Sequence, residues 1–411
     1  INKPLKDYLK EQCPNAKKDL FATFMEVFPD HAWQRGRFAF ITPPNWMFLT
    51  SFGDLRRRYI DDYFFESLMH LSRGIFGADF GSVATVVQKA KQNGRTGTYL
   101  RLIERTFQEF KVEHLHALFR RVMENPGYRY DFSEYEKDVS IPEESSPDGQ
   151  RLYYPSIDQK EFENIPGSSI AYWVEEEAIE AFKKGRYISE IGTPIRGIST
   201  GDNKRFTRHW PEVSFNRVSV PGESEPTKKW HGYNKGGGGR RWYGHLDFLL
   251  DWEDEGSELK AYSGSYVRNL PYQFKEGLSW SNISSEGFSV RYSPPGLLYD
   301  QGGSGLILET EDIPLVSGLL NSKVADYLLT AINPTLNFLV GDVAKIPVLD
   351  LYNTDNVDSL VQHSIEIARR DWNSREDSWD FTKHPLVEQN ATSLRAAYDA
   401  WNEQVTDDFF Q

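Results

Sequence analysis

The segment RFAFITPPNWMF, residues 37–48, decides how the first part of the chain is interpreted. Residues 37–42 predict a short strand, and Pro43 and Pro44 end it because proline has no N–H to donate to a sheet ladder. A helix is predicted just before this strand, over residues 19–28, where apolar side chains recur at helical spacing and Asp19 is placed to cap. The sequence therefore predicts an α/β arrangement.

The alternation of helix and strand continues through the first part of the chain. Its predicted elements are helices at residues 55–63 and 107–123 and strands at 66–71, 82–88 and 98–103. Residues 125–149 are acidic and carry proline and serine, which favours a linker. A helix is expected after it, at residues 173–184.

Residues 186–348 show a different pattern, with short β-like runs, many glycines and scattered Trp and Tyr. A helix is predicted at residues 313–330 and a strand at 346–349. The tail from residue 356 predicts an amphipathic helix. Its expected buried stripe consists of Val357, Leu360, Val361, Ile365 and Ala368.

Length and composition exclude several classes of protein. The chain has 411 residues, which predicts two or three domains at roughly 100–200 residues each. Cys13 is the single cysteine, so a disulfide framework and a Cys-rich zinc site are excluded, and we expect a reducing, cytoplasmic location. No apolar run approaches the ~18–20 residues that span a bilayer, so no membrane partner is expected.

Charge is distributed unevenly along the chain, whose formal net charge is −13. Residues 131–180 contain 14 acidic and 3 basic side chains, whereas residues 196–243 contain 4 acidic and 10 basic ones. A basic stretch within an acidic chain indicates one local anionic partner. The acidic segments 131–180 and 351–411 are interpreted as solvated surface, with docking of a protein as the alternative.

No catalytic motif stands out. His-Glu-x-x-His and Cys-x-x-Cys patterns are missing from the sequence, and no Gly-x-Ser-x-Gly elbow is found where a strand meets a helix. Gly236–Gly239 lacks the Gly-Lys-Ser/Thr ending of a phosphate-binding loop, and a mobile loop is the favoured interpretation. TPPNW at residues 42–46 looks like the Asn/Asp-Pro-Pro-aromatic loop of amino-methyltransferases, but Thr42 lacks the amide carbonyl that would accept a hydrogen bond. A strand-ending turn is favoured there.

Basic, amide and aromatic residues are interleaved in residues 200–206, 228–235 and 240–244. Arg and Lys contact phosphates or guanine edges, Asn reads adenine, and aromatic rings pack on sugars or exposed bases. This mixture predicts a surface that reads double-stranded DNA. A solvated loop face, or a protein or carbohydrate surface, is the alternative. For a second cluster, over residues 268–291, a strand pair with a polar face is an equal alternative.

Four stretches make the sequence recognisable: FITPPNWMFLTSF (40–52), TGDNKRF (200–206), KWHGYNKGG (229–237), and LLNSK (319–323) with NPT (333–335) and IPV (346–348). With them the chain resembles the PglX-type adenine-specific DNA methyltransferases of BREX phage-defence systems. The resemblance covers nearly the whole chain, and its two middle stretches are fairly specific.

The resemblance implies an α/β protein in which the last strands of a Rossmann-like methyltransferase sheet precede a mixed α+β target-recognition domain and carboxy-terminal helices. The implied parts are the distal methyltransferase domain (1–124), an acidic linker and helix (125–185), the target-recognition domain (186–349) and a helical tail (350–411). Double-stranded DNA and other proteins of the defence complex are the implied partners.

One departure from the family bears on mechanism. The family's Gly-rich strand for S-adenosylmethionine and its Asn-Pro-Pro-Tyr loop precede the helix that the segment 19–28 resembles, and neither occurs here. We therefore expect a carboxy-terminal portion that alone is inactive and binds no S-adenosylmethionine. A non-enzymatic DNA specificity subunit is the alternative function. A carbohydrate-binding or hydrolytic protein is a third class, although no paired acidic motif supports it.

The resemblance also implies site residues. Phe76, or alternatively Phe80, matches the aromatic residue that holds an extruded adenine, against the alternative of core packing. The DNA-binding candidates are Asn203, Lys204, Arg205, Lys228, Lys229, Lys235, Arg240, Arg241, Arg268, Lys275, Trp280 and Arg291. No residue of this chain is predicted to be catalytic or to bind a metal.

Overall fold

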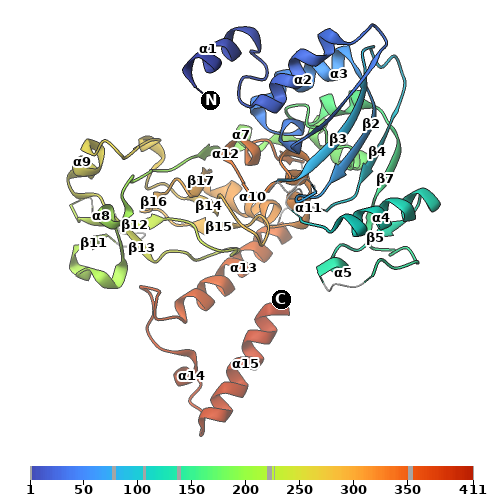
Figure 1. The fold of residues 1–411 in the computed structure, drawn as a ribbon. Coiled ribbons are helices and arrows are strands. Elements are labelled where there is room, and N and C mark those ends of the chain that lie inside the picture. The colour runs from blue at the N-terminus through green and yellow to red at the C-terminus, as the bar shows by residue number, and fades with distance from the viewer. Residues whose placement is uncertain are drawn as a thin grey trace. The chain divides into compact units, whose positions relative to one another are not determined.

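A computed structural model describes residues 2–75, 80–104, 108–136, 140–219, 225, 227–349 and 355–410. The described residues form a mixed α/β structure, as the sequence predicts (Figure 1). They divide into a first unit, residues 1–184 with 328–335, and a second unit, residues 185–327 with 336–411.

The first unit is built on a five-stranded sheet with the order β1-β3-β2-β4-β7. Its strands are β1 (Arg37–Thr42), β2 (Phe64–Leu71), β3 (Ser82–Gln88), β4 (Gly97–Arg101) and β7 (Tyr153–Ile157), and a separate pair consists of β5 (Arg129–Tyr130) and β6 (Gln150–Arg151). Only β2 and β4 pair in parallel within the five-stranded sheet; its other pairs are antiparallel. The predicted strands 37–42 and 82–88 are confirmed to the residue.

The first unit also contains helices and 3-10 turns. They are α1 (Lys3–Gln12), α2 (Leu20–His31), α3 (Gly53–Asp62), α4 (Val112–Glu124), α5 (Ser133–Glu136) and α6 (Glu176–Lys184), with 3-10 turns η1 (Pro44–Met47), η2 (Thr50–Phe52) and η3 (Gln159–Asn164). α2 lies against β1 and α3 against β2. That this sheet is the end of a Rossmann-like sheet stays a prediction.

Part of the acidic stretch predicted as a linker is packed in the structure. Tyr128, Tyr130 and Phe132 are buried in one apolar cluster with Leu118 of α4 and Leu102. Burial of these aromatic side chains stabilises a folded segment, although the segment is acidic. Its charge alone therefore does not identify it as a linker.

Arg56 of α3 fastens the chain that follows β1. Its side chain is buried, and Nη1 donates to the carbonyl oxygens of Trp46 at 2.8 Å and Leu49 at 2.7 Å. Nε and Nη2 both donate to the carbonyl oxygen of Gly167, at 3.1 and 2.7 Å. Burial lowers the pKa of this guanidinium to about 10, which still leaves it charged at neutral pH. One side chain thus satisfies three carbonyls.

Strands of the second unit form two larger sheets and one pair. The first sheet has the order β10-β13-β12-β11 with β16 on β12, the second β15-β14-β17-β9, and the pair is β18-β8. Their bounds are β8 (Arg186–Tyr187), β9 (Thr193–Ile195), β10 (Thr207–His209), β11 (Val218–Ser219), β12 (Trp230–Asn234), β13 (Phe248–Asp251), β14 (Gly277–Ser281), β15 (Val290–Ser293), β16 (Leu298–Tyr299), β17 (Gly303–Ile307) and β18 (Pro347–Val348).

The chain from residue 185 onwards also contains helices and 3-10 turns. They are α7 (Ile188–Ile191), α8 (Asn203–Phe206), α9 (Glu253–Ala261), α10 (Ile313–Leu320), α11 (Lys323–Ile332), α12 (Val340–Val343), α13 (Asp355–Asn373), α14 (Pro385–Glu388) and α15 (Leu394–Phe410), with 3-10 turns η4 (Trp210–Glu212), η5 (Phe215–Arg217), η6 (Leu270–Tyr272) and η7 (Thr310–Asp312).

The single helix predicted at residues 313–330 is wrong, because the chain forms α10 and α11 with a break between them. At the break, the Asn321 side chain accepts from the Val290 N–H at 2.9 Å and donates to the Val290 carbonyl at 3.1 Å. These contacts fix Asn321 against β15. The predicted stripe of α13 is confirmed at Val361, which is buried, but Leu360 is exposed.

Replacement of Arg56 by Met tests the guanidinium contacts. Three carbonyls would lose the donor that the buried guanidinium supplies, so we expect the free energy of unfolding to fall by about 3 kcal/mol in urea titrations. Arg57→Met is the matched control, since Arg57 is exposed on the same helix and pairs with Asp54 at 2.5 Å. Equal effects of the two substitutions would contradict this account.

His70 of β2 makes stability depend on pH. The Tyr172 hydroxyl donates to the Leu100 carbonyl at 3.1 Å, so it accepts from Nδ1–H of His70 at 2.9 Å. Burial lowers the pKa of His70 to about 3. In the unfolded chain this histidine binds a proton below about pH 6.5, whereas in the folded protein it does so only near pH 3. The contribution of His70 to the free energy of unfolding is therefore complete above about pH 6.5 and is lost as the pH falls towards 3. We expect His70→Phe to flatten the fall in melting temperature between pH 6.5 and 4. An unchanged pH profile would refute this role.

Candidate functional site

Three segments of the second unit end at the same edge. β12 and β16 pair in parallel, with Tyr233 opposite Leu298 and Asn234 opposite Tyr299. The same register places the next residues, Lys235 and Asp300, beside one another. Ile198 bridges Asp300 in parallel as well, so the chain from Ser199 onwards leaves at this edge.

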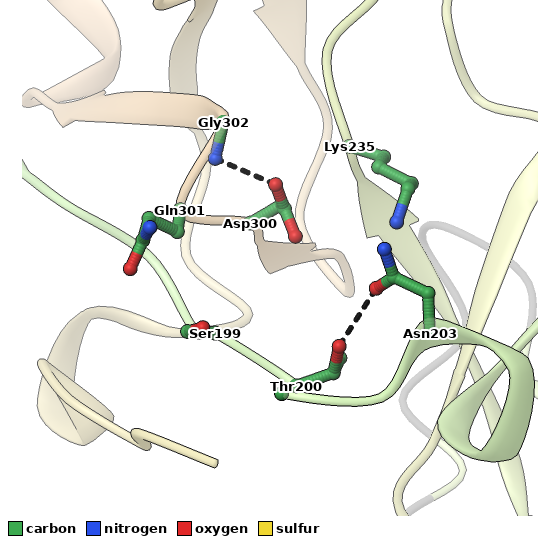
Figure 2. A pocket seen from close by; sticks show the side chains of 8 residues that line it. Ser199, Thr200, Asn203, Lys235, Asp300, Gln301 and Gly302 are labelled. Carbon is green, nitrogen blue, oxygen red and sulfur yellow. Dashed lines mark hydrogen bonds between the residues drawn. The ribbon is translucent and has the colours of Figure 1, made fainter. Parts of the chain in front are cut away.

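A polar hollow of about 370 Å³ opens where these segments end (Figure 2). It is lined by Ser199, Thr200, Gly201, Asn203, Lys235, Asp300, Gln301 and Gly302. Two motifs that the sequence analysis treats separately, TGDNKRF and KWHGYNKGG, therefore contribute to one site. None of the described residues that line this hollow contributes an apolar side chain, so its chemistry is that of hydrogen bonds and charge.

Backbone and side-chain donors hold the carboxylate of Asp300. The Gly302 N–H donates to Oδ1 at 2.6 Å, and the hydroxyl of buried Tyr233 donates to Oδ2. Burial raises the pKa of Asp300, while the hydrogen bonds and the nearby Lys235 ammonium oppose that rise. Burial likewise lowers the pKa of Lys235, and the charge of Asp300 opposes it. An ammonium and a carboxylate thus face one partly desolvated space.

Asn203 is positioned by its own loop. The Thr200 hydroxyl donates to Oδ1 of Asn203 at 2.7 Å, which turns the amide nitrogen towards Lys235 (Figure 2). Asp202 caps the next turn by accepting from the Arg205 N–H at 3.1 Å. Gly201 has a φ of +68°, and a Cβ there would lie 2.2 Å from the Gly264 carbonyl oxygen. Only glycine fits this position without strain.

Several predicted DNA-binding cations are engaged inside the second unit. Lys229 lies 2.9 Å from Asp251 and 2.6 Å from Glu253, and Lys228 lies 3.0 Å from Glu225. Arg205 pairs with Glu258. Arg240 pairs with Asp371 of α13 at 2.7 Å and donates to the Tyr243 carbonyl at the same distance. These partners neutralise charge that a phosphate would otherwise meet.

Trp280 and Arg291 are corrected, because their side chains lie in the core. Trp280 is 0% exposed and its Nε1 donates to the Phe338 carbonyl at 2.9 Å. Arg291 is 1% exposed, and burial lowers the pKa of its guanidinium to about 10. Neither side chain can reach DNA in this structure, so we remove both from the candidates.

Lys204, Arg241 and Lys275 are the exposed cations among the other candidates. Arg268 is half-buried, with its guanidinium 4.2 Å from the ring centre of Tyr266. Phe80, in the first unit, is 49% exposed. Phe76 lies outside the described residues.

Hydrogen bonds hold part of the glycine run, although Gly237 and Gly238 are exposed, and that the run is a mobile loop stays a prediction. The Gly237 N–H donates to Ser281 Oγ at 3.0 Å, and Nε2 of His245 donates to the Gly238 carbonyl at 3.0 Å. A Cβ at Gly237 would lie 2.5 Å from the His245 ring. A Cβ at Gly239 would lie 2.4 Å from Glu286 Oε2, whereas a Cβ at Gly238 would meet nothing nearer than 3.8 Å, so close approach accounts for Gly237 and Gly239.

The TPPNW segment forms a strand-ending turn. β1 ends at Thr42, and the buried Trp46 donates from Nε1 to Thr42 Oγ1 at 2.9 Å. Across the described part of the chain, no group of three or more His, Cys, Asp or Glu side chains is arranged to hold a metal ion. Within the same residues, none of the helices combines the length and apolarity needed to cross a membrane.

The chain is similar in sequence to two curated proteins. The adenine-specific methyltransferase BrxX of Escherichia coli O9:H4 (strain HS) is 33% identical over 393 residues, which cover 94% of this chain and 30% of BrxX. The adenine-specific methyltransferase PglX of Lacticaseibacillus casei (strain Zhang) is 33% identical over 100% of this chain and 33% of PglX. The chain therefore spans about a third of the length of these relatives. No family model matches the sequence.

Similarity to solved structures is weaker. The type IIL restriction-modification enzyme MmeI in complex with DNA is 12% identical, with a TM-score of 0.45 over 99% of this chain and 52% of MmeI. The type IIG restriction endonuclease BpuSI is 10% identical, with a TM-score of 0.33 over 90% of this chain and 47% of BpuSI.

Gly201→Ala tests how the loop of the hollow is built. A side chain at this φ is strained and would also collide with the Gly264 carbonyl, so we expect a loss of stability of about 2 kcal/mol or more, seen as a lower melting temperature. Gly341→Ala is the matched control, since nothing lies within 4 Å of its added Cβ. A tolerated Gly201→Ala would show that the loop has another conformation.

Proposed function

The chain belongs to the PglX-type family of adenine-specific methyltransferases, and from this premise we propose that it supplies sequence-specific recognition of double-stranded DNA within such an enzyme. The observation that carries the proposal is the meeting of Lys235, Asn203 and Asp300 in one open polar hollow. Donors and an acceptor fixed at one edge are what a reader of base edges requires.

The other exposed cations support the same function. Lys204 directly follows Asn203 of the hollow, and Arg241 directly follows the engaged Arg240. Exposed Lys and Arg side chains neutralise phosphates and release counterions, which fixes a protein on a duplex without reading its sequence. We assign phosphate contact to Lys204, Arg241 and Lys275, and base contact to the hollow.

Methyl transfer is assigned to residues outside this chain. The methyl donor of such enzymes is S-adenosylmethionine, and the polar hollow offers its adenine ring no apolar or aromatic side chain to pack against. In TPPNW, Thr42, Pro44 and Trp46 are buried, and Thr42 stands where the catalytic loop has its asparagine. Methylating adenine inside a duplex needs an extruded base. Among the described residues, we propose exposed Phe80 for stacking on the extruded base. Other phage-defence proteins are proposed as further partners.

Salt dependence tests the proposed function. Affinity for a duplex, measured by fluorescence anisotropy, should fall as salt rises, since phosphate contacts release counterions. The double substitution Lys204→Ala with Arg241→Ala should weaken binding and reduce the slope of log affinity against log salt by about two. Lys383→Ala removes one exposed lysine of the tail and serves as the control. Affinity that does not respond to salt would contradict phosphate contact by this chain.

A further inference from the structure

We propose that Lys235, Asn203 and Asp300 together read one G·C base pair from the major groove. The inference rests on the proposed function and extends it from DNA in general to one base pair. Asp300 is the new element, because sequence patterns give no indication of a carboxylate at this site. Lys235 and Asp300 follow directly on paired parallel strands, so the backbone itself sets them side by side.

Asp300 decides between the two kinds of DNA contact. A lysine alone suits a phosphate, but here a phosphate would meet the carboxylate as well, and two anions repel strongly where water is partly excluded. A carboxylate can only accept hydrogen bonds. In the major groove the base-edge donors are the amino groups of cytosine and adenine. The hollow therefore fits a base edge better than the sugar-phosphate backbone.

The order of the groups selects G·C over A·T. Lys235, Asn203 and Asp300 line the same hollow, and Figure 2 shows the nitrogens of Lys235 and Asn203 pointing towards one another, with the Asp300 carboxylate to one side. This sequence of acceptor, donor, donor complements the cytosine amino group followed by guanine O6 and N7. An A·T pair instead places its single donor between two acceptors, so the carboxylate would have to lie in the middle.

All three groups are held before any DNA arrives. The carboxylate of Asp300 already accepts hydrogen bonds from the Gly302 and Gly303 N–H groups and from Tyr233, and of its about four lone-pair sites one is left for a base. Asn203 is fixed by Thr200 at 2.7 Å. Lys235 packs its ammonium 5.3 Å from the ring centre of Phe248. Groups fixed in this way lose little freedom on binding.

Selection from a randomised duplex library tests the proposal. The chain is incubated with the library, bound duplexes are sequenced, and the base preference is calculated for each position. We expect wild type to select a site with one fixed G·C pair. Asp300→Asn and Lys235→Gln should each reduce the preference at that position by about tenfold and leave the other positions unchanged.

Matched controls in the tail are Asp407→Asn and Lys383→Gln, which make the same chemical changes at exposed positions and should leave the selected site unchanged. Thermal melting checks the fold of each variant, and Lys235→Gln decides the matter where Asp300→Asn does not fold. A selected site that survives both substitutions at every position overturns this inference alone. Wild type that selects no sequence overturns the proposed function and the inference with it.

Discussion

Asp300 is the group on which the site depends. Burial raises the pKa of its carboxylate, and the Gly302 N–H, the Tyr233 hydroxyl and the neighbouring Lys235 ammonium oppose that rise. A buried carboxylate without such partners would take up a proton and lose its function as an acceptor. The parallel pairing of β12 and β16 supplies one of these partners, because it sets Lys235 in register with Asp300.

Much of the fold is visible in the sequence because its signals are local. The strand at residues 37–42 is followed by two prolines, and the strand at residues 82–88 is rich in β-branched side chains. Each strand is therefore recognised without knowing which strands pair with it. The break between α10 and α11 is different. It depends on Asn321 binding the backbone of Val290, thirty-one residues away, and no helical periodicity reports such a contact.

The site shows the same division. Asn203 and Lys235 can be predicted from segments in which basic, amide and aromatic residues mix, but Asp300 cannot, since its place depends on a strand pairing across 65 residues. The only local signal is a carboxylate between the aromatic end of β16 and two glycines. Trp280 and Arg291 share the composition of DNA-binding residues, and only packing shows that they belong to the core.

A structure of the chain on a duplex that it selects tests the central claim most directly. The account predicts that the hollow opens onto the major groove, with Lys235 and Asp300 within hydrogen-bond distance of the two bases of one pair. A duplex that lies across another surface, with the hollow facing solvent, would contradict it.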